Sequence, residues 1–135
     1  MVPAAKAEDY QTVESLSGLS FAGENGSAGM EQAEAAGLDY VAMDTQAKAL
    51  MEVASGTSDA AIIDLLMAGA MIGEGTSYPD LTYTVQLNSE EYGVGFRKGS
   101  DLAEAFNNFW KEAYDAGTVM ETAKTYGVQE SVIEK

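Results

Sequence analysis

The sequence has 135 residues, of which 46% are hydrophobic, and its formal net charge is −15. This length and hydrophobic content predict one folded domain with a core, alone or with an appendage. Seven basic residues against 22 acidic ones argue against nucleic acid as a partner, because phosphate binding needs clustered Lys and Arg. Cysteine and histidine are both absent, which excludes disulfides, thiolate nucleophiles and Ser-His-Asp triads.

The first half of the chain alternates predicted strands and predicted helices, separated by glycines. Residues 19–22 predict a strand, 28–36 a helix that ends at Gly37, and 38–43 a second strand. Asp44 or Thr45 is expected to cap the next helix. In that helix an apolar stripe at helical spacing is predicted over Ala47, Leu50, Met51 and Ala54. Residues 60–63 form a continuous apolar run, which is typical of a strand buried on both faces.

The second half predicts one more helix, two extended segments and a helical pair. Residues 65–72 can be helical, residues 81–87 alternate as a half-buried strand does, and residues 92–96 predict another extended segment. Ser100 or Asp101 is expected to cap a long helix, and Gly117 to separate it from a shorter one. The apolar face of the long helix is predicted from Leu102, Ala105, Phe106, Phe109 and Ala113, with Trp110 beside it.

Strands that alternate with helices predict an α/β fold with a mainly parallel sheet flanked by helices. Ligands of such sheets bind beyond the carboxyl ends of the strands, where helix N-termini also point. Two loops meet this condition: residues 24–28 after the first strand, and Asp64 after the third. No segment approaches the ~20 apolar residues of a membrane span, and no signal peptide is recognisable in the chain.

The loop with Asn25, Gly26, Ser27 and Ala28 is the first candidate binding element. Small residues let a ligand approach the backbone, and the exposed N–H groups at a helix start favour an anion. The alternative is that Ser27 is only an N-cap. The loop has neither the lysine of a Walker motif nor a GxGxxG pattern.

Asp64 is the second candidate, at the end of the apolar run and before a predicted helix. Its carboxylate can cap Leu66 or Met67, or it can face the crevice and pair with an ammonium group. An anion site and a cation site in one cleft are what a zwitterion needs. Among the other candidates, the methionines Met67 and Met71 are interpreted as core filler.

Three segments together resemble a known family: LSGLSFAGENGSAGMEQAEA, then DTQAKALMEVASGTSDAAIID, then EEYGVGFRKGSDLAEAFNNFWKEAYDAGTVMETAKTYG. They are similar to the extracytoplasmic solute-binding proteins of amino-acid ABC transporters, which have the type 2 periplasmic-binding-protein fold. The resemblance runs from about Tyr10 to Gly127. It implies that residues 1–98 are the second ligand-binding lobe with the return hinge strand. It also implies that residues 99–135 are a helical pair that packs on a first lobe, absent here.

The resemblance further implies a non-catalytic role in amino-acid capture, without a cofactor or metal. Ser27 and the N–H of Ala28 match the loop that binds the α-carboxylate, and Asp64 matches the residue that holds the α-ammonium. The expected partners are an amino acid and, in the full-length protein, an ABC transporter permease. The expected location is extracytoplasmic, in the periplasm or lipid-anchored at the outer face of the membrane.

Two alternatives remain open on the same fold: a dehydratase-type enzyme that uses Asp64 or Glu24 as a general acid, and a sensory effector domain. The apolar C-terminal helices add an expectation of self-association.

Overall fold

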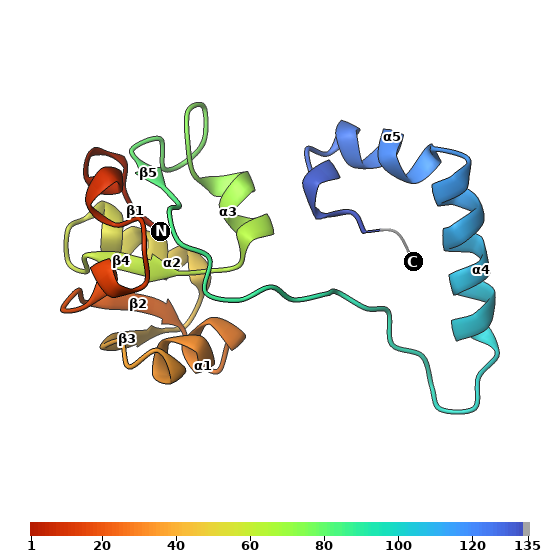
Figure 1. Ribbon diagram of the computed structural model, residues 1–135, viewed down its shortest axis with the longest axis horizontal. Helices are drawn as coiled ribbons and strands as arrows, with labels where there is room; N and C mark the ends of the chain where they lie inside the picture. The colour runs from red at the N-terminus through yellow and green to blue at the C-terminus, as the bar shows by residue number, and fades with distance from the viewer. Residues whose placement is uncertain (134–135) are drawn as a thin grey trace. The chain divides into compact units, whose positions relative to one another are not determined.

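The computed structural model describes residues 1–133 and divides the chain into two compact units, Met1–Ser89 and Glu90–Lys135 (Figure 1). Glu134 and Lys135, the end of the predicted C-terminal segment, lie outside the described residues. We describe each unit by itself. The assignment of residues 1–98 to a ligand-binding lobe and of residues 99–135 to a tail stays a prediction.

The first unit alternates strands and helices, as the glycine spacing predicts. Its regular elements are β1 (Val2–Pro3), β2 (Phe21–Glu24), α1 (Ala28–Ala35), β3 (Tyr40–Met43), α2 (Gln46–Ala54), β4 (Ala60–Ile62), α3 (Leu65–Met71) and β5 (Leu81–Thr82). Two short 3-10 helices, Ala4–Asp9 and Glu14–Leu16, precede β2.

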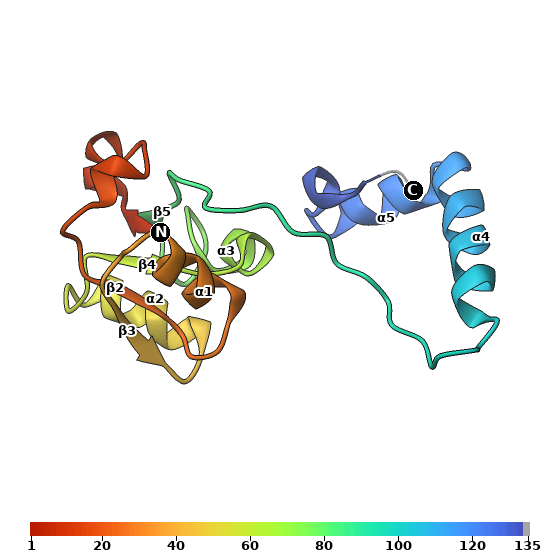
Figure 2. The ribbon, with the colours of Figure 1, turned by 60° about the horizontal axis from the view of Figure 1, so that its bottom comes forward.

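Within the described residues, β2, β3 and β4 form a parallel sheet in the order β3-β2-β4, which Figure 2 shows in sequence from β4 to β3. Phe21 is in register with Tyr40 on one side and with Ala60 on the other. The three carboxyl ends therefore meet at one edge of the sheet. The outer edge of β4 pairs with the first residue, because the Ala61 N–H donates to the Met1 carbonyl at 2.8 Å.

The sheet has a core on each face, because successive strand residues point to opposite sides. One core joins the sheet residues Ala22 and Ala61 to the helices α2 and α3. Its buried members are Ala22, Ala49, Leu50, Val53, Ala61, Ala68, Ile72 and Leu81. The other core contains Val2, Leu16, Phe21 and Ala60. On that second face Met30 of α1 lies over Gly23. The α/β layers predicted from the sequence are therefore present.

The apolar stripe of α2 lies one position away from the predicted one. Ala49, Leu50 and Val53 are buried, whereas Met51 is 58% exposed and Ala54 is also exposed. The prediction was wrong for these two residues because the buried face lies on the side of Leu50 that carries Ala49 and Val53, and Met51 and Ala54 lie on its other side. In the run at 60–63, Ala60 and Ala61 are buried as expected, whereas Ile62 and Ile63 are half-buried. The run supplies an outer strand of the sheet, with β2 in the middle.

The extended segments after residue 80 are shorter than predicted. β5 covers only Leu81–Thr82 and pairs antiparallel with β1. No strand is assigned between residues 83 and 97 of the described chain, so the predicted strand at 92–96 does not form. Tyr92 and Val94 are mostly exposed there. The strands assigned in the described chain pair β1 with β5 and β2 with β3 and β4, and this segment belongs to neither sheet.

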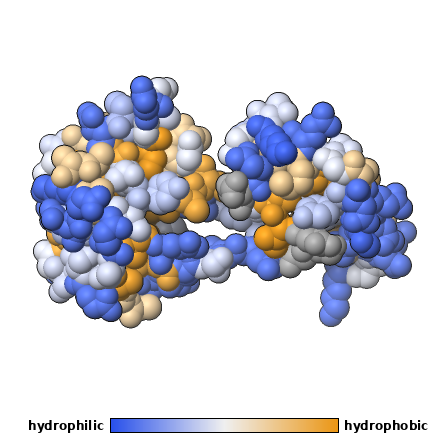
Figure 3. All heavy atoms as spheres, turned by 45° about the horizontal axis from the view of Figure 1, so that its top comes forward, coloured by the Kyte–Doolittle hydropathy of each residue, from blue (hydrophilic) through white to orange (hydrophobic). Residues whose placement is uncertain are grey.

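The second unit consists of α4 (Leu102–Asp115), α5 (Thr118–Thr125) and a 3-10 helix at Gln129–Ser131. Asp101 is the N-cap residue of α4, but its side chain makes no cap hydrogen bond; instead Ser100 Oγ accepts from the Leu102 N–H at 3.2 Å. Gly117 separates α4 from α5, as predicted, and its φ is 80°. Of the 14 residues of α4, all of them described, none is buried. Apolar atoms are accordingly visible on the surface in Figure 3.

Candidate functional site

Three strand-to-helix connections meet at the carboxyl edge of the parallel sheet (Figure 1). Each connection ends in an N-cap residue whose side chain accepts from the helix that follows: Ser27 for α1, Thr45 for α2 and Asp64 for α3. N-caps satisfy backbone N–H groups that lack a partner inside the helix. The edge is thus lined by three helix starts, two of which the sequence had singled out.

The Ser27 loop is a tight turn at the end of β2. The Ser27 N–H donates to the Glu24 carbonyl at 3.2 Å, and Gly26 has φ 71°, which only glycine adopts readily. The Asn25 N–H donates to the Met43 carbonyl at 2.9 Å, which ties the loop to the end of β3. The loop backbone is therefore fixed in place before any ligand binds.

The cap role of Ser27 is confirmed, and it leaves room for a ligand role. Ser27 Oγ accepts from the Met30 N–H at 3.3 Å. The N–H groups of Ala28 and Gly29 at the first turn of α1 have no acceptor within the helix. Ala28 is exposed and Ser27 is half-buried. Such N–H groups, together with the positive end of the helix dipole, attract a carboxylate or phosphate.

Gly29 brings the Ser27 loop against the end of β4. A Cβ on Gly29 would lie 2.9 Å from Ile62 Cγ2 and 3.6 Å from the Ile62 carbonyl oxygen. Real Cβ atoms do not approach other atoms so closely, so the absence of a side chain permits this packing. Ile62 stands two residues before Asp64. The first turn of α1 and the start of α3 are therefore neighbours at the same edge.

Asp64 acts as the N-cap of α3. Its Oδ1 accepts from the Leu66 N–H at 2.9 Å and from the Met67 N–H at 3.1 Å. The residue is half-buried. The cap alternative that the sequence left open is thus confirmed. Capping by one carboxylate oxygen does not conflict with a contact between the carboxylate and an ammonium group, because a carboxylate has about four acceptor positions.

A third connection contributes a residue that the sequence reasoning missed. Gln46, the first residue of α2, accepts from the Asp64 N–H through its Oε1 at 2.8 Å, and the bond is partly buried. Its neighbour Thr45 accepts from the Lys48 N–H at 3.2 Å. The available hint was that α2 starts after a parallel strand, at the same edge as the two loops that were selected.

The remaining surface features lie elsewhere. A shallow depression is found near the C-terminus of α2, lined by residues that include Val53, Gly56 and Tyr78. α2 has nine residues, so the depression lies about 13 Å along the helix from the candidate site. Among the described residues no group of three acidic side chains has a metal-binding arrangement. No helix in the described part of the chain is both long enough and apolar enough to cross a bilayer.

The comparisons with known proteins agree with this architecture. The chain resembles a crystal structure of a mutant of ArgBP from T. maritima, with a TM-score of 0.69 and 28% identity. The match covers 87% of this chain and 51% of that one, so the chain spans about half the length of that protein. No protein-family model matches the sequence, and no curated protein matches it.

The chain therefore has a mixed α/β fold that matches one lobe of a periplasmic binding protein, as predicted. In such folds the ligand binds beyond the carboxyl ends of the parallel strands, and that is the edge where Ser27, Gln46 and Asp64 lie.

Proposed function

We propose that this chain forms one wall of an amino-acid binding site and has no catalytic role. The α-carboxylate binds at the loop of Asn25, Gly26, Ser27 and Ala28, and the α-ammonium binds Asp64. The observation that carries the proposal is the close packing of Gly29 on Ile62, which makes an anion-binding helix start and a carboxylate neighbours. A zwitterion requires these two charges at a short separation.

The structural neighbour supports a binding role over the dehydratase alternative. ArgBP is an arginine-binding periplasmic protein. By extension, the full-length protein delivers an amino acid to an ABC transporter permease and works outside the cytoplasm, either in the periplasm or lipid-anchored at the outer face of the membrane. The identity of the amino acid depends on side-chain contacts that the other wall of the cleft also supplies.

The helical unit has a separate proposed role. Residues 99–135 pack against the first lobe in a two-lobe protein, and residues 92–98 form the return strand of the hinge. Both proposals rest on apolar side chains that stay exposed in this chain, such as Tyr92 and Phe109. In this chain the same exposed apolar face promotes self-association.

The chain should bind amino acids weakly, because a charge pair is strong only when both walls exclude water. We therefore propose a titration of ¹⁵N-labelled protein with a panel of L-amino acids that includes arginine. Binding with a dissociation constant on the order of millimolar is expected. The amide shifts should concentrate at residues 25–29 and 64–67. The desamino and decarboxylated analogues of arginine should each bind more weakly than arginine.

Two variants separate the cap role of Asp64 from its ligand role. Asp64→Asn keeps an N-cap acceptor, so its unfolding free energy should stay within a few tenths of a kcal/mol, while Asp64→Ala should lose about 1 kcal/mol. Both variants should lose most of the amino-acid response, because neither carries the charge that pairs with the ammonium.

Three results would contradict the proposal. One is the absence of any shift at residues 25–29 and 64–67 with every amino acid. Another is an Asp64→Asn affinity within about twofold of wild type, since losing a charge partner in a binding site costs more than that. The third is sub-micromolar affinity of the 135-residue chain by calorimetry, which would show that one wall suffices.

A further inference from the structure

We infer that Gln46 is a positioning residue for the amino-acid site, and that it acts by fixing the backbone of Asp64. The inference rests on the proposed function, because it concerns the same site. It starts from one bond: the Asp64 N–H donates to Gln46 Oε1 at 2.8 Å, across 18 residues of sequence. This bond joins the α2 start to the α3 start.

The N–H of Asp64 needs a partner from outside its own helix. β4 ends at Ile62, so the sheet ladder does not reach Asp64. In a capping box, a Glu or Gln at the third helical position accepts from the N–H of the cap residue. That position of α3 is Met67, which has no such acceptor. Gln46 takes this role from another helix.

The result is a divided capping box. Asp64 Oδ1 accepts from the Leu66 and Met67 N–H groups, and Gln46 accepts from the Asp64 N–H. The side chain of Asp64 is therefore held by α3, and its backbone N–H is held by α2. The position of the Asp64 carboxylate depends on the distance between two helix starts, and Gln46 sets that distance.

Gln46 is itself held in place. It is the first residue of α2, and the preceding cap, Thr45, bonds to the Lys48 N–H at 3.2 Å. The helix is anchored by Leu50, which is fully buried. Since a backbone N–H is a donor, the oxygen of the Gln46 amide must face Asp64. The chemistry of the contact thus requires an acceptor at position 46, and it does not require the amide nitrogen.

This requirement gives a matched pair of variants. Gln46→Met keeps the length of the side chain and removes the acceptor. Gln46→Glu keeps the acceptor and replaces the nitrogen. In Gln46→Met the ¹H resonance of the Asp64 amide should move upfield and its hydrogen exchange should accelerate. Amino-acid affinity should fall by about twofold to tenfold, the effect of one lost hydrogen bond. Gln46→Glu should keep the Asp64 amide shift and exchange near wild type, and the negative charge that it adds should not weaken the binding of an ammonium group.

A double mutant tests whether Gln46 acts through Asp64. In an Asp64→Asn background, Gln46→Met should weaken amino-acid binding by less than about 1.5-fold, because the group it positions no longer carries its charge. A merely structural role would lower affinity by the same factor in both backgrounds. Thermal unfolding of each variant shows whether the folded state persists at the titration temperature.

The outcomes distinguish this inference from the proposed function. A wild-type protein that shows no response to amino acids overturns both. A responsive wild type with an unchanged Gln46→Met affinity overturns the role of Gln46 alone. Equal losses of affinity in Gln46→Met and Gln46→Glu would show that the acceptor at position 46 does not decide affinity, which also overturns the positioning role.

Discussion

Gly29 decides how closely two parts of the candidate site approach each other. It lies in the first turn of α1, where glycine is usually a poor choice for a helix. A side chain at this position would meet Ile62 Cγ2 at 2.9 Å, and Ile62 belongs to the strand that leads to Asp64. Glycine at position 29 therefore lowers the helix propensity of α1, and it also allows α1 to pack against the strand that leads to Asp64.

Gly29→Ala should destabilise the protein by about 1–3 kcal/mol, because the new methyl group displaces a branched side chain in a packed region. Gly69→Ala in α3 is the matched control, since a Cβ there meets nothing within 4 Å. The control should stabilise the protein by about 0.5–1 kcal/mol through helix propensity. Urea unfolding of both variants at equal protein concentration measures the difference.

Shortening the Ile62 side chain tests whether contact with it causes the penalty of Gly29→Ala. In an Ile62→Ala background, Gly29→Ala should lose its penalty, because Ile62 Cγ2 is gone. The two substitutions should therefore be strongly non-additive. Additive effects, or a stabilising Gly29→Ala in the wild-type background, would show that the approach of α1 to β4 is looser than described.

The elements of the first unit were predictable where a local pattern decides them. Ser27 was a candidate cap, and Thr45 was one of two candidates with Asp44, because their side-chain oxygens precede helical runs. The buried face of α2 was misplaced at Met51, since spacing alone does not say which side of a helix meets the sheet. The segment at 92–96 was predicted to be extended, and no strand is assigned to it in the described chain. Pairing depends on a neighbour, which no local pattern contains.

The contacts between elements were the least predictable part of the site. Parallel strands bring their carboxyl ends together, so the Ser27 and Asp64 loops were expected at one edge. The bond from the Asp64 N–H to Gln46 joins residues 18 positions apart. It depends on the register of β3 against β2, which hydrophobic spacing does not set. Gln46 therefore became visible only in the structure.

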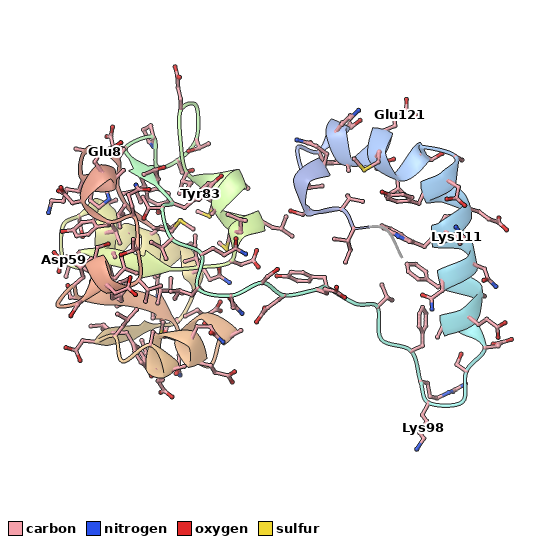
Figure 4. All side chains as sticks on the ribbon, viewed as in Figure 1. Glu8, Asp59, Tyr83, Lys98, Lys111 and Glu121 are labelled. Carbon is pink, nitrogen blue, oxygen red and sulfur yellow. The ribbon has the colours of Figure 1, made fainter. Side chains whose placement is uncertain are left out.

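The opposite edge of the sheet is held by a pair of polar residues. Asp59 Oδ2 accepts from the Ser20 N–H at 2.9 Å and from Ser20 Oγ–H at 2.8 Å. These bonds join the residue before β4 to the residue before β2. They also lower the pKa of Asp59, because they favour its charged form. Figure 4 shows Asp59 at the surface of the first unit.

Asp59→Ala should destabilise the protein at neutral pH by at most about 1 kcal/mol, since the hydrogen bonds are exposed. The folded-state pKa is below the unfolded value of about 3.9. The stabilisation is therefore fully present above pH ~4 and is lost as the pH falls through the folded-state pKa. Urea unfolding of wild type and variant near neutral pH and near pH 2.5 should show the difference shrinking in acid.

The control for this pH dependence is Asp39→Ala, an exposed carboxylate just before β3. Its effect on the unfolding free energy near neutral pH should be small, because the side chain is exposed. An Asp59→Ala penalty that grows in acid would contradict the assignment, because it would mean that protonated Asp59 stabilises the fold more than the carboxylate does.

At the scale of the whole molecule, charge and exposed apolar surface act against each other. The net charge of −15 repels second copies, and the Debye length of about 8 Å at physiological salt limits the range of that repulsion. On α4, Leu102 is 56% exposed and Phe109 is 63% exposed. Next to them Phe106 stacks on Trp110 with ring centroids 6.3 Å apart. Contact between copies through this face removes apolar area from water.

We therefore expect reversible self-association with a dissociation constant on the order of 0.1–1 mM, since a single helix face buries less than a standard interface. Association should strengthen between about 20 mM and 500 mM salt, because the repulsion is screened while the apolar contact is not. Sedimentation velocity over a concentration series measures it. Phe109→Lys should abolish association, and Asn107→Lys, with the same change of charge on another side of α4, should not. Equal effects of the two variants would assign the association to charge and not to the apolar face.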